Sequence, residues 1–462
     1  MAHFIKHYLI LLILCLVTGQ VTGQVIPYPP VPDLETSSVY SVTANGENIW
    51  TEQFISDMDM QQLPDWFSDD QVRKPQEVHI ARFSGSGRVD ICIELTVQPE
   101  LVTVHPLSRG IDPLEEDNRV LFSLPGPDKL MVSVMDLPPL FLFMDPPEKD
   151  PPSAGDPGVH YFGPGVHHPG YIELRDNETV YIDAGATVYG GIRANNVSNI
   201  SVKGAGILDG DFEYNSMVRL ENCENIVFEG ILIRYGRGWT NTIINSRNVL
   251  YEGVKVISFG PSGDGINPLG SEKVRIRDCF LRCTDDCIAI KAPDYASNVE
   301  DIVVERNTMI GFAYSDGVTI GFETNAPEVK DIVVRDCDIL MARGGSRVNG
   351  HSGFSIVCDG PSVISNILFN DIRVEKTEEK LFELIVTNGT LYGDDPPGNI
   401  SGITLQNIRW FHEGKILLTG LDDQHRIDRV VFKACTVNGK PLTSVSGTVI
   451  MKNKFVGEVI LE

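Results

Sequence analysis

A four-residue pattern recurs along the C-terminal part of this chain and limits the folds that are open to it. Each copy has a polar or small residue, then Ile or Val, then any residue, then an apolar residue. The copies begin at Asn199, Asn225, Asn248, Lys273, Asp301, Asp331, Asn366, Gly402 and Arg429. Successive copies start 23 to 36 residues apart, and one strand pattern per interval of this length is typical of a solenoid.

The segments between the copies indicate which solenoid this is. They hold short β-type runs and turns rich in Gly and Asn, without a leucine lattice or the 3.6-residue periodicity of helical repeats. A parallel β-helix is therefore predicted. Alternate apolar residues such as Ile226 and Phe228 should point inward and stack on the next coil. The longer intervals after Asp301 should form loops on one side of the coil.

The first 24 residues have the features of a signal peptide. Lys6 and His7 precede an apolar run from Tyr8 to Val17, and small or polar residues follow as far as Gln24. A membrane anchor would need a longer apolar stretch, and no other run in the sequence approaches membrane-spanning length. We therefore expect a secreted, extracellular protein that has no membrane partner.

The segment between the signal peptide and the repeats has a different pattern. From Val25 to Met144, short β-type runs alternate with Pro- and Gly-rich turns, which favours an antiparallel β-sandwich. The stretch Asp145 to Gly158 is rich in proline, which lacks the backbone donor that a sheet requires, and is typical of a linker. The predicted order is a signal peptide at 1–24, a β-sandwich domain at 25–157 and a β-helix domain at 158–462.

The net charge of −25 excludes several classes of partner. Nucleic acid, acidic lipid headgroups and highly anionic polymers would all meet like-charge repulsion, so neutral or sparsely charged partners fit better. The acidity could equally well serve only to keep a secreted protein soluble. Five N-x-S/T triplets would permit a glycoprotein, at Asn177, Asn196, Asn199, Asn388 and Asn399. The sequence fixes neither disulfide pairing nor oligomeric state.

Three aspartates recur at a spacing that suits a β-helix. Asp264 precedes Asp285 and Asp286 by 21 and 22 residues, which is close to one coil, so all three carboxylates could crowd one patch. Crowding would raise at least one pKa and keep a proton available near neutral pH. Glycosidic cleavage needs one protonated carboxyl and one ionised carboxylate. Solvated turn residues and a calcium site are the alternatives that the residues leave open.

The segments around these aspartates resemble the polygalacturonase-like family of glycoside hydrolases, which are right-handed parallel β-helix enzymes. The similarity covers roughly Tyr161 to the C-terminus and is strongest in the Asp-Gly at Asp264 and in the run Asp-Asp-Cys-Ile-Ala-Ile from Asp285. The resemblance implies a polysaccharide or oligosaccharide substrate, Asp285 as general acid, and Asp264 and Asp286 as the bases that activate water, with inversion at the anomeric carbon. The spacing alone leaves retention open.

Two departures from the family pattern bear on the substrate. Asp316 stands where the family has a histidine, and Ser355 and Val357 stand where it has the two cations that grip a galacturonate carboxylate. Loss of both cations removes charge-assisted hydrogen bonds to an acidic sugar, so plain galacturonan is not the expected substrate. We expect Lys291, Asp316 and Glu323 to bind substrate, although Lys291 and Glu323 could instead be solvated surface charges.

A second resemblance points to neutral sugars. A β-sandwich placed ahead of a β-helix is similar to the domain layout of dextranase- and isopullulanase-type enzymes, which act on neutral α-glucans. Trp239 lies about one coil before Asp264 and is either a sugar platform or a core residue. We expect a glycoside hydrolase without metal or organic cofactor. The alternatives are a non-catalytic carbohydrate-binding or matrix protein and a polysaccharide lyase, which would need a basic residue to remove a proton.

Overall fold

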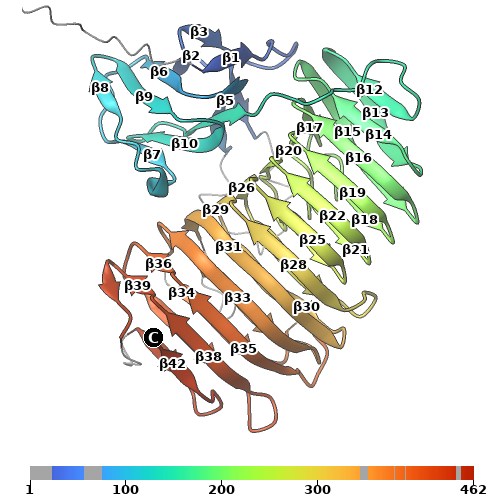
Figure 1. Cartoon of the computed structure of the whole chain (residues 1–462), viewed down its shortest axis with the longest axis vertical. Coiled ribbons are helices and arrows are strands. Elements are labelled where there is room, and N and C mark those ends of the chain that lie inside the picture. The colour runs from blue at the N-terminus through green and yellow to red at the C-terminus, as the bar shows by residue number, and fades with distance from the viewer. Residues whose placement is uncertain (1–22, 57–74, 344–351, 379, 391, 444–448) are drawn as a thin grey trace, which may run out of the picture.

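The computed structural model describes residues 23–56, 75–343, 352–378, 380–390, 392–443 and 449–462. Strands make up almost all of its regular structure, arranged as a small two-sheet unit beside a long coil of parallel strands (Figure 1). The predicted signal peptide lies almost wholly outside the described residues. Within the part that is described, no helix has the length and apolar character needed to cross a membrane.

The N-terminal unit consists of two sheets that share one core. The first sheet contains β1 (Gln24–Pro27), β4 (Thr51–Ile55), β5 (Glu77–Ser86), β7 (Val102–His105), β10 (Asp128–Val134) and β11 (Leu140–Asp145). The second contains β2 (Tyr40–Ala44), β3 (Glu47–Ile49), β6 (Val89–Leu95), β8 (Leu114–Glu116) and β9 (Arg119–Leu124). All pairings are antiparallel except that of β11 with β5, which is parallel. A short 3-10 helix, η2 (Leu107–Arg109), follows β7.

The rest of the chain winds into coils whose strands form three parallel faces. The first face contains β12 (Val159–Phe162), β14 (Thr179–Ile182), β16 (Ser198–Gly204), β19 (Glu224–Glu229), β22 (Arg247–Glu252), β25 (Glu272–Arg277), β28 (Val299–Glu305), β31 (Glu328–Ala342), β33 (Val363–Val374), β35 (Asn399–Gln406), β38 (Ile427–Lys433) and β42 (Val459–Leu461). The long strands β31 and β33 continue into the second face.

The other two faces complete each coil. The second face contains β13 (Gly165–Leu174), β15 (Ala186–Asn195), β17 (Ile207–Asp209), β20 (Leu232–Arg234), β23 (Lys255–Ile257), β26 (Phe280–Cys283), β29 (Thr308–Gly311), β36 (Arg409–Trp410) and β39 (Thr436–Val437), with β40 (Lys440–Pro441) paired antiparallel to β39. The third face begins with the C-terminal halves of β13 and β15, which continue into it from the second face. It also contains β18 (Val218–Glu221), β21 (Asn241–Ile244), β24 (Ile266–Leu269), β27 (Ile288–Ala292), β30 (Val318–Thr324), β32 (Phe354–Cys358), β34 (Lys380–Val386), β37 (Lys415–Thr419) and β41 (Ile450–Lys452). The predicted parallel β-helix preceded by a smaller β-sandwich is confirmed.

The recurring sequence pattern marks the same place on every coil. Its Ile or Val residues pair directly in the first face, as Ile200, Ile226 and Val249 do, and they fill the interior. The polar residue before each of them has a positive φ between 53° and 64°. Asparagine accepts this left-handed conformation more readily than most residues, and its side chain can bond to the next coil.

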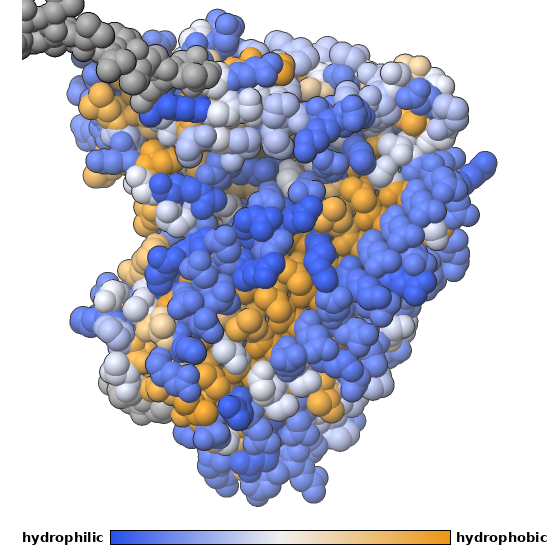
Figure 2. Space-filling view, in the orientation of Figure 1, coloured by the Kyte–Doolittle hydropathy of each residue, from blue (hydrophilic) through white to orange (hydrophobic). Residues whose placement is uncertain are grey.

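The asparagine side chains form a ladder of hydrogen bonds between successive coils. Asn225 donates its side-chain N–H to Asn199 Oδ1 at 2.9 Å, and Asn248 donates to Asn225 Oδ1 at 3.1 Å. On the outside of the same face, half-buried apolar residues alternate with the interior ones, for example Val227 and Leu250. Figure 2 shows an apolar band along this side of the β-helix between hydrophilic borders.

The β-sandwich packs against the second face through buried ionic contacts. Arg234 on β20 contacts both Glu52 on β4 and Asp209 on β17, and all three side chains are buried. Lys255 on β23 lies 2.7 Å from Asp145 at the end of β11. Desolvated charges persist in a protein interior only when they are paired and hydrogen-bonded, so these contacts fix the orientation of the sandwich. The boundary at residues 157 and 158 stays a prediction.

We predict that Asn225→Ala lowers the free energy of unfolding by roughly 1–3 kcal/mol, because it removes two ladder hydrogen bonds and places alanine in a left-handed conformation. Asn225→Gly should cost less, since glycine adopts positive φ without strain. Urea unfolding followed by circular dichroism measures both. If the alanine and glycine variants lose the same stability, backbone conformation contributes nothing at this position.

Candidate active site

The predicted aspartates lie on successive rungs of the third face, at the turns that lead into its strands. Asp264 precedes β24, Asp286 precedes β27 and Asp316 precedes β30. The backbone N–H of Gly265 donates to the carbonyl of Asp286 at 2.9 Å, and that of Cys287 donates to the carbonyl of Asp316 at 3.0 Å. These bonds place Asp264, Asp286 and Asp316 in one column along the axis of the β-helix.

Glycine on each side of Asp264 makes this close stacking possible. A Cβ atom on Gly265 would lie 2.4 Å from the carbonyl oxygen of Cys287, and one on Gly263 would lie 2.5 Å from Thr284 Oγ1. Any other residue would push the two rungs apart. The Gly-Asp-Gly sequence therefore sets the distance between Asp264 and the next pair of carboxylates.

Hydrogen bonds orient each carboxylate. Asn267 donates to Asp264 Oδ2 at 2.8 Å, and the backbone N–H of Asp286 donates to Asp285 Oδ1 at 3.1 Å. The backbone N–H of Asp316 donates to Asp286 Oδ1 at 2.9 Å. Asp264 and Asp286 are only 2% and 4% exposed, whereas Asp285 is partly exposed. Asp285 is thus the member of the predicted trio that a ligand can reach most directly.

Burial and mutual repulsion raise the pKa values of the column. The pKa of Asp264 lies well above its usual value, first because the group is buried and then because Asp285 is close. The same two causes raise the pKa of Asp286 to about 7, and the pKa of Asp316 is raised by burial and by Asp286. Interacting carboxylates share protons, so the cluster as a whole holds a proton near neutral pH.

Lys291, near the C-terminal end of β27, lies close to two other predicted substrate-binding residues and to the aspartates. Its ammonium group forms an ion pair with Glu323 at 2.7 Å and lies 5.1 Å from the ring centroid of the partly buried Trp239. The positive charge of Lys291 also lowers the pKa values of Asp264 and Asp286. Lys291, Glu323 and Trp239 therefore meet beside the carboxylates.

Asp316 lies deeper than a surface sugar-binding residue would. It is fully buried, accepts the backbone N–H of Ser352, and has Ser355 beside it. Its role in binding substrate stays a prediction.

A buried ion pair that was not predicted from the sequence lies on β34, two coils beyond the strand that Asp316 precedes. Lys380 Nζ is 2.5 Å from Glu383 Oε2, and Glu383 pairs with Ser355 between β34 and β32. Lys380 lowers the pKa of Asp316, so it belongs to the same charge cluster. The sequence carried no direct signal for this pair, because only the strand register shows that Glu383 occupies the position of Ser355 on the next coil.

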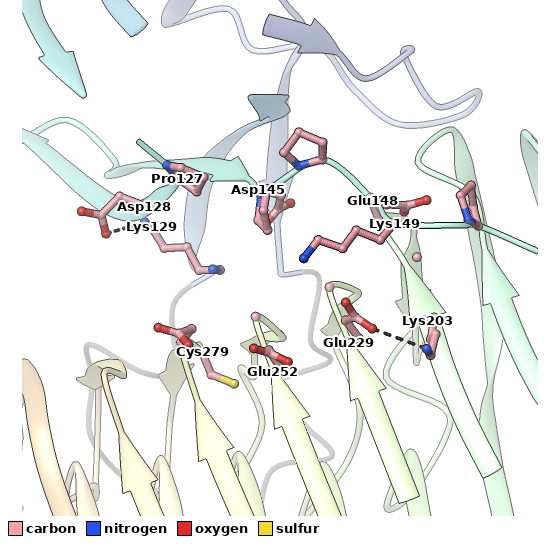
Figure 3. A pocket seen from close by; sticks show the side chains of 18 of the residues that line it. Pro127, Asp128, Lys129, Asp145, Glu148, Lys149, Lys203, Glu229, Glu252 and Cys279 are labelled. Atoms are coloured by element: carbon pink, nitrogen blue, oxygen red, sulfur yellow. Dashed lines mark hydrogen bonds and ion pairs between the residues drawn. The ribbon is translucent and has the colours of Figure 1, made fainter. Parts of the chain in front are cut away.

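A cavity of about 640 Å³ lies elsewhere, between the β-sandwich and the turns of the β-helix (Figure 3). Lys129 and Lys149 point into it from the sandwich side, opposite Glu229 and Glu252. None of the aspartates of the column lines it. Within the described residues, no group of three or more His, Cys, Asp or Glu side chains is arranged to hold a metal ion.

Comparisons with known proteins agree with this fold and with the motifs. Residues 187–411 match the family model described as Glycosyl hydrolases family 28. A curated relative, Probable exopolygalacturonase B of Aspergillus flavus, is 26% identical over 231 residues, which are 46% of this chain and 50% of the relative. Probable polygalacturonase of Vitis vinifera is 26% identical over 149 residues, 30% of each chain. The chain thus matches between about a third and a half of the length of these relatives.

Solved structures extend the similarity to the whole fold. Dex49A from Penicillium minioluteum superposes with a TM-score of 0.70 at 15% identity, over 95% of this chain and 96% of that chain. An exopolygalacturonase from Thermotoga maritima gives a TM-score of 0.53 at 17% identity, over 66% of this chain and 84% of that chain. The predicted resemblance to the polygalacturonase-like glycoside hydrolases is confirmed, and the predicted likeness in domain layout to dextranase-type enzymes agrees with the superposition on Dex49A. The roles of the individual site residues stay predictions.

The raised carboxylate pKa values predict a dependence of stability on pH. In the folded state the cluster keeps a proton up to about pH 7, as the pKa of Asp286 indicates, whereas unfolded aspartate releases it near pH 4. The stability from this proton is fully present below about pH 4 and is lost as the pH rises towards 7. Asp286→Asn should therefore reduce the loss of unfolding free energy between pH 5 and pH 8, measured by urea titration.

The exposed Asp428 on β38 provides the matched control for that measurement. Asp428→Asn removes the same charge outside the cluster and should leave the difference between the two pH values unchanged. An equal difference in the parent and in Asp286→Asn would show that the pKa of Asp286 is not raised.

Proposed function

We propose that this protein hydrolyses O-glycosidic bonds of a polysaccharide whose sugars are neutral. The observation that carries the proposal is the column of Asp264 and Asp286 on neighbouring rungs, with the more accessible Asp285 beside them. A glycosidase needs one carboxyl that gives a proton to the leaving oxygen and one carboxylate that activates water. A cluster of carboxylates that shares a proton near neutral pH can supply both.

The accessibility of the carboxylates supports a division of labour. Asp285 is the proposed general acid because it reaches the surface, where the glycosidic oxygen would lie. Asp264 and Asp286 are the proposed bases that hold and deprotonate water, and Asn267 orients Asp264 for that task. Inversion at the anomeric carbon is part of the proposal through the resemblance to the polygalacturonase-like family.

The charge of the site supports a neutral sugar. Two lysines and six carboxylates lie together here: Lys291, Lys380, Asp264, Asp285, Asp286, Asp316, Glu323 and Glu383. Each lysine is already paired with a glutamate. A uronate would therefore meet an excess of negative charge and would have to compete with Glu323 or Glu383 for its cation. Sugar hydroxyls, in contrast, can donate hydrogen bonds to carboxylates.

The proposed setting is extracellular, because the N-terminal segment has the features of a signal peptide. A secreted hydrolase would meet its polymer outside the cell. Mass spectrometry of the N-terminus of protein recovered from the culture medium of expressing cells tests this part of the proposal.

We predict that Asp285→Asn lowers kcat roughly 10²- to 10⁴-fold, because a general acid contributes on this order. The assay incubates the protein with neutral and uronic-acid polysaccharides and measures new reducing ends together with the absorbance of unsaturated products. The parent should release reducing ends from a neutral polymer without unsaturation. Asp428→Asn removes an exposed aspartate on β38 and should keep full activity.

The other outcomes of this assay are equally informative. Unsaturated products would indicate a lyase, and full activity of Asp285→Asn would remove Asp285 from the role of acid. The absence of cleavage in every polymer would favour a non-catalytic carbohydrate-binding protein. NMR of the first product anomer distinguishes inversion from retention.

A further inference from the structure

Two loops leave the third face beside the charge cluster, and the side chain of Asn245 contacts the first of them twice. This loop, residues 293–298, follows β27. Asn245 Oδ1 accepts the backbone N–H of Ser297 at 2.7 Å, and Asn245 Nδ2 donates to the backbone carbonyl of Tyr295 at 3.4 Å. Asn245 therefore fixes the backbone that carries Tyr295.

The second loop, which follows β34, is held in the same way. Asn325 Oδ1 accepts the backbone N–H of Asp394 at 2.8 Å, and Asn325 Nδ2 donates to the backbone carbonyl of Tyr392 at 3.3 Å. Thr390 adds a hydrogen bond to the buried carboxylate of Asp359 at 2.8 Å. This contact ties the loop to the end of β32.

The two anchors occupy matching positions in the fold. Asn245 directly follows β21, two coils before β27, and Asn325 directly follows β30, two coils before β34. Each loop thus reaches back across two coils and ends on an asparagine. The same arrangement at two places along the face presents one tyrosine from each loop.

Both tyrosines are exposed although the backbone beneath them is fixed. The side chains of Tyr295 and Tyr392 are 58% and 49% exposed. Exposed aromatic residues on ordered backbone lose little conformational entropy when a ligand binds, and their rings offer a large apolar plane. A sugar ring has an apolar face of its own that can pack on such a plane.

The position of the tyrosines connects them with the proposed active site. Burial and the nearby Glu323 raise the pKa of Tyr295, and Lys291 is also among its charged neighbours. The ring of Tyr392 packs edge-on against Phe322, with 6.1 Å between centroids, and Phe322 directly precedes Glu323. Tyr295 therefore lies near the Lys291–Glu323 ion pair, and Tyr392 lies against the residue next to Glu323. Both loops follow strands of the third face, whereas the aspartates precede strands of that face.

We propose that Tyr295 and Tyr392 are platforms for the rings of a neutral polysaccharide, and that Asn245 and Asn325 are the residues that position them. This inference rests on the proposed function, because it takes a polysaccharide as the ligand. Two platforms on separate loops extend the site over more than one sugar unit. Long chains then bind more tightly than short ones.

The test measures binding without turnover, in an Asp285→Asn background. Native gels that contain soluble dextran, pullulan, xyloglucan or polygalacturonate report affinity as retardation of the protein. Tyr295→Ala and Tyr392→Ala should each weaken binding to the retarding neutral polymer about tenfold, a typical effect of truncating a central aromatic contact. Tyr295→Phe and Tyr392→Phe keep the ring plane and should retain near-parent affinity.

Phe411→Ala is the matched control, because Phe411 is an aromatic residue that is 38% exposed and directly follows β36 on the second face. It should bind as the parent does. If the alanine variants of Tyr295 and Tyr392 bind like the parent, the platforms are refuted while hydrolysis can still stand. If no polymer retards the parent, the platforms are refuted as well, whatever the hydrolysis assay shows.

The anchoring role has a separate readout. Asn245→Ala should weaken polymer binding, whereas Asn245→Asp keeps the acceptor for the N–H of Ser297 and should restore part of the affinity. Thermal unfolding of both variants identifies any general loss of stability. Equal affinity of Asn245→Ala and the parent would show that the anchor does not position Tyr295.

Discussion

Hydrogen bonding between successive parallel coils is the constraint on which the rest of this structure depends. Neighbouring strands lie about 4.8 Å apart, so residues at the same place on successive coils are brought together whatever their charges. Interior positions use this spacing to stack Ile and Val, and the turn before the third face uses it to stack carboxylates. The repulsion among Asp264, Asp286 and Asp316 is tolerated because the whole ladder holds their backbone.

The two lysines of the charge cluster are paired in the same way. Lys291 and Lys380 lie on strands of the same face, and each is neutralised by a glutamate rather than by an aspartate of the column. The lysines therefore moderate the pKa values of the aspartates without forming ion pairs that would keep them ionised. This arrangement leaves a shared proton in the cluster, which the proposed general acid requires.

The features that could be predicted from the sequence are those that recur once in every coil. The polar residue with positive φ and the inward Ile or Val after it recur in each copy of the repeat, so the repeat could be recognised without a structure. The aspartates could be recognised as well, because Asp264 lies one coil before Asp285 and Asp286. Lys380 and Glu383 escaped because intervals of 35 and 36 residues between late coils obscure which residues face each other. The anchors escaped for the same reason, since Asn325 bonds to Asp394 across 69 residues.

The β-sandwich and the candidate site lie on different faces of the coil, and this separation has a consequence for specificity. The sandwich docks on the second face through Arg234, Lys255 and Phe280, whereas the aspartates and the tyrosine loops adjoin strands of the third face. Loops that leave the third face can therefore change in length without disturbing the buried ionic contacts that hold the sandwich. In the proposed hydrolase, one set of carboxylates can thus be kept while the loops are fitted to different polymers.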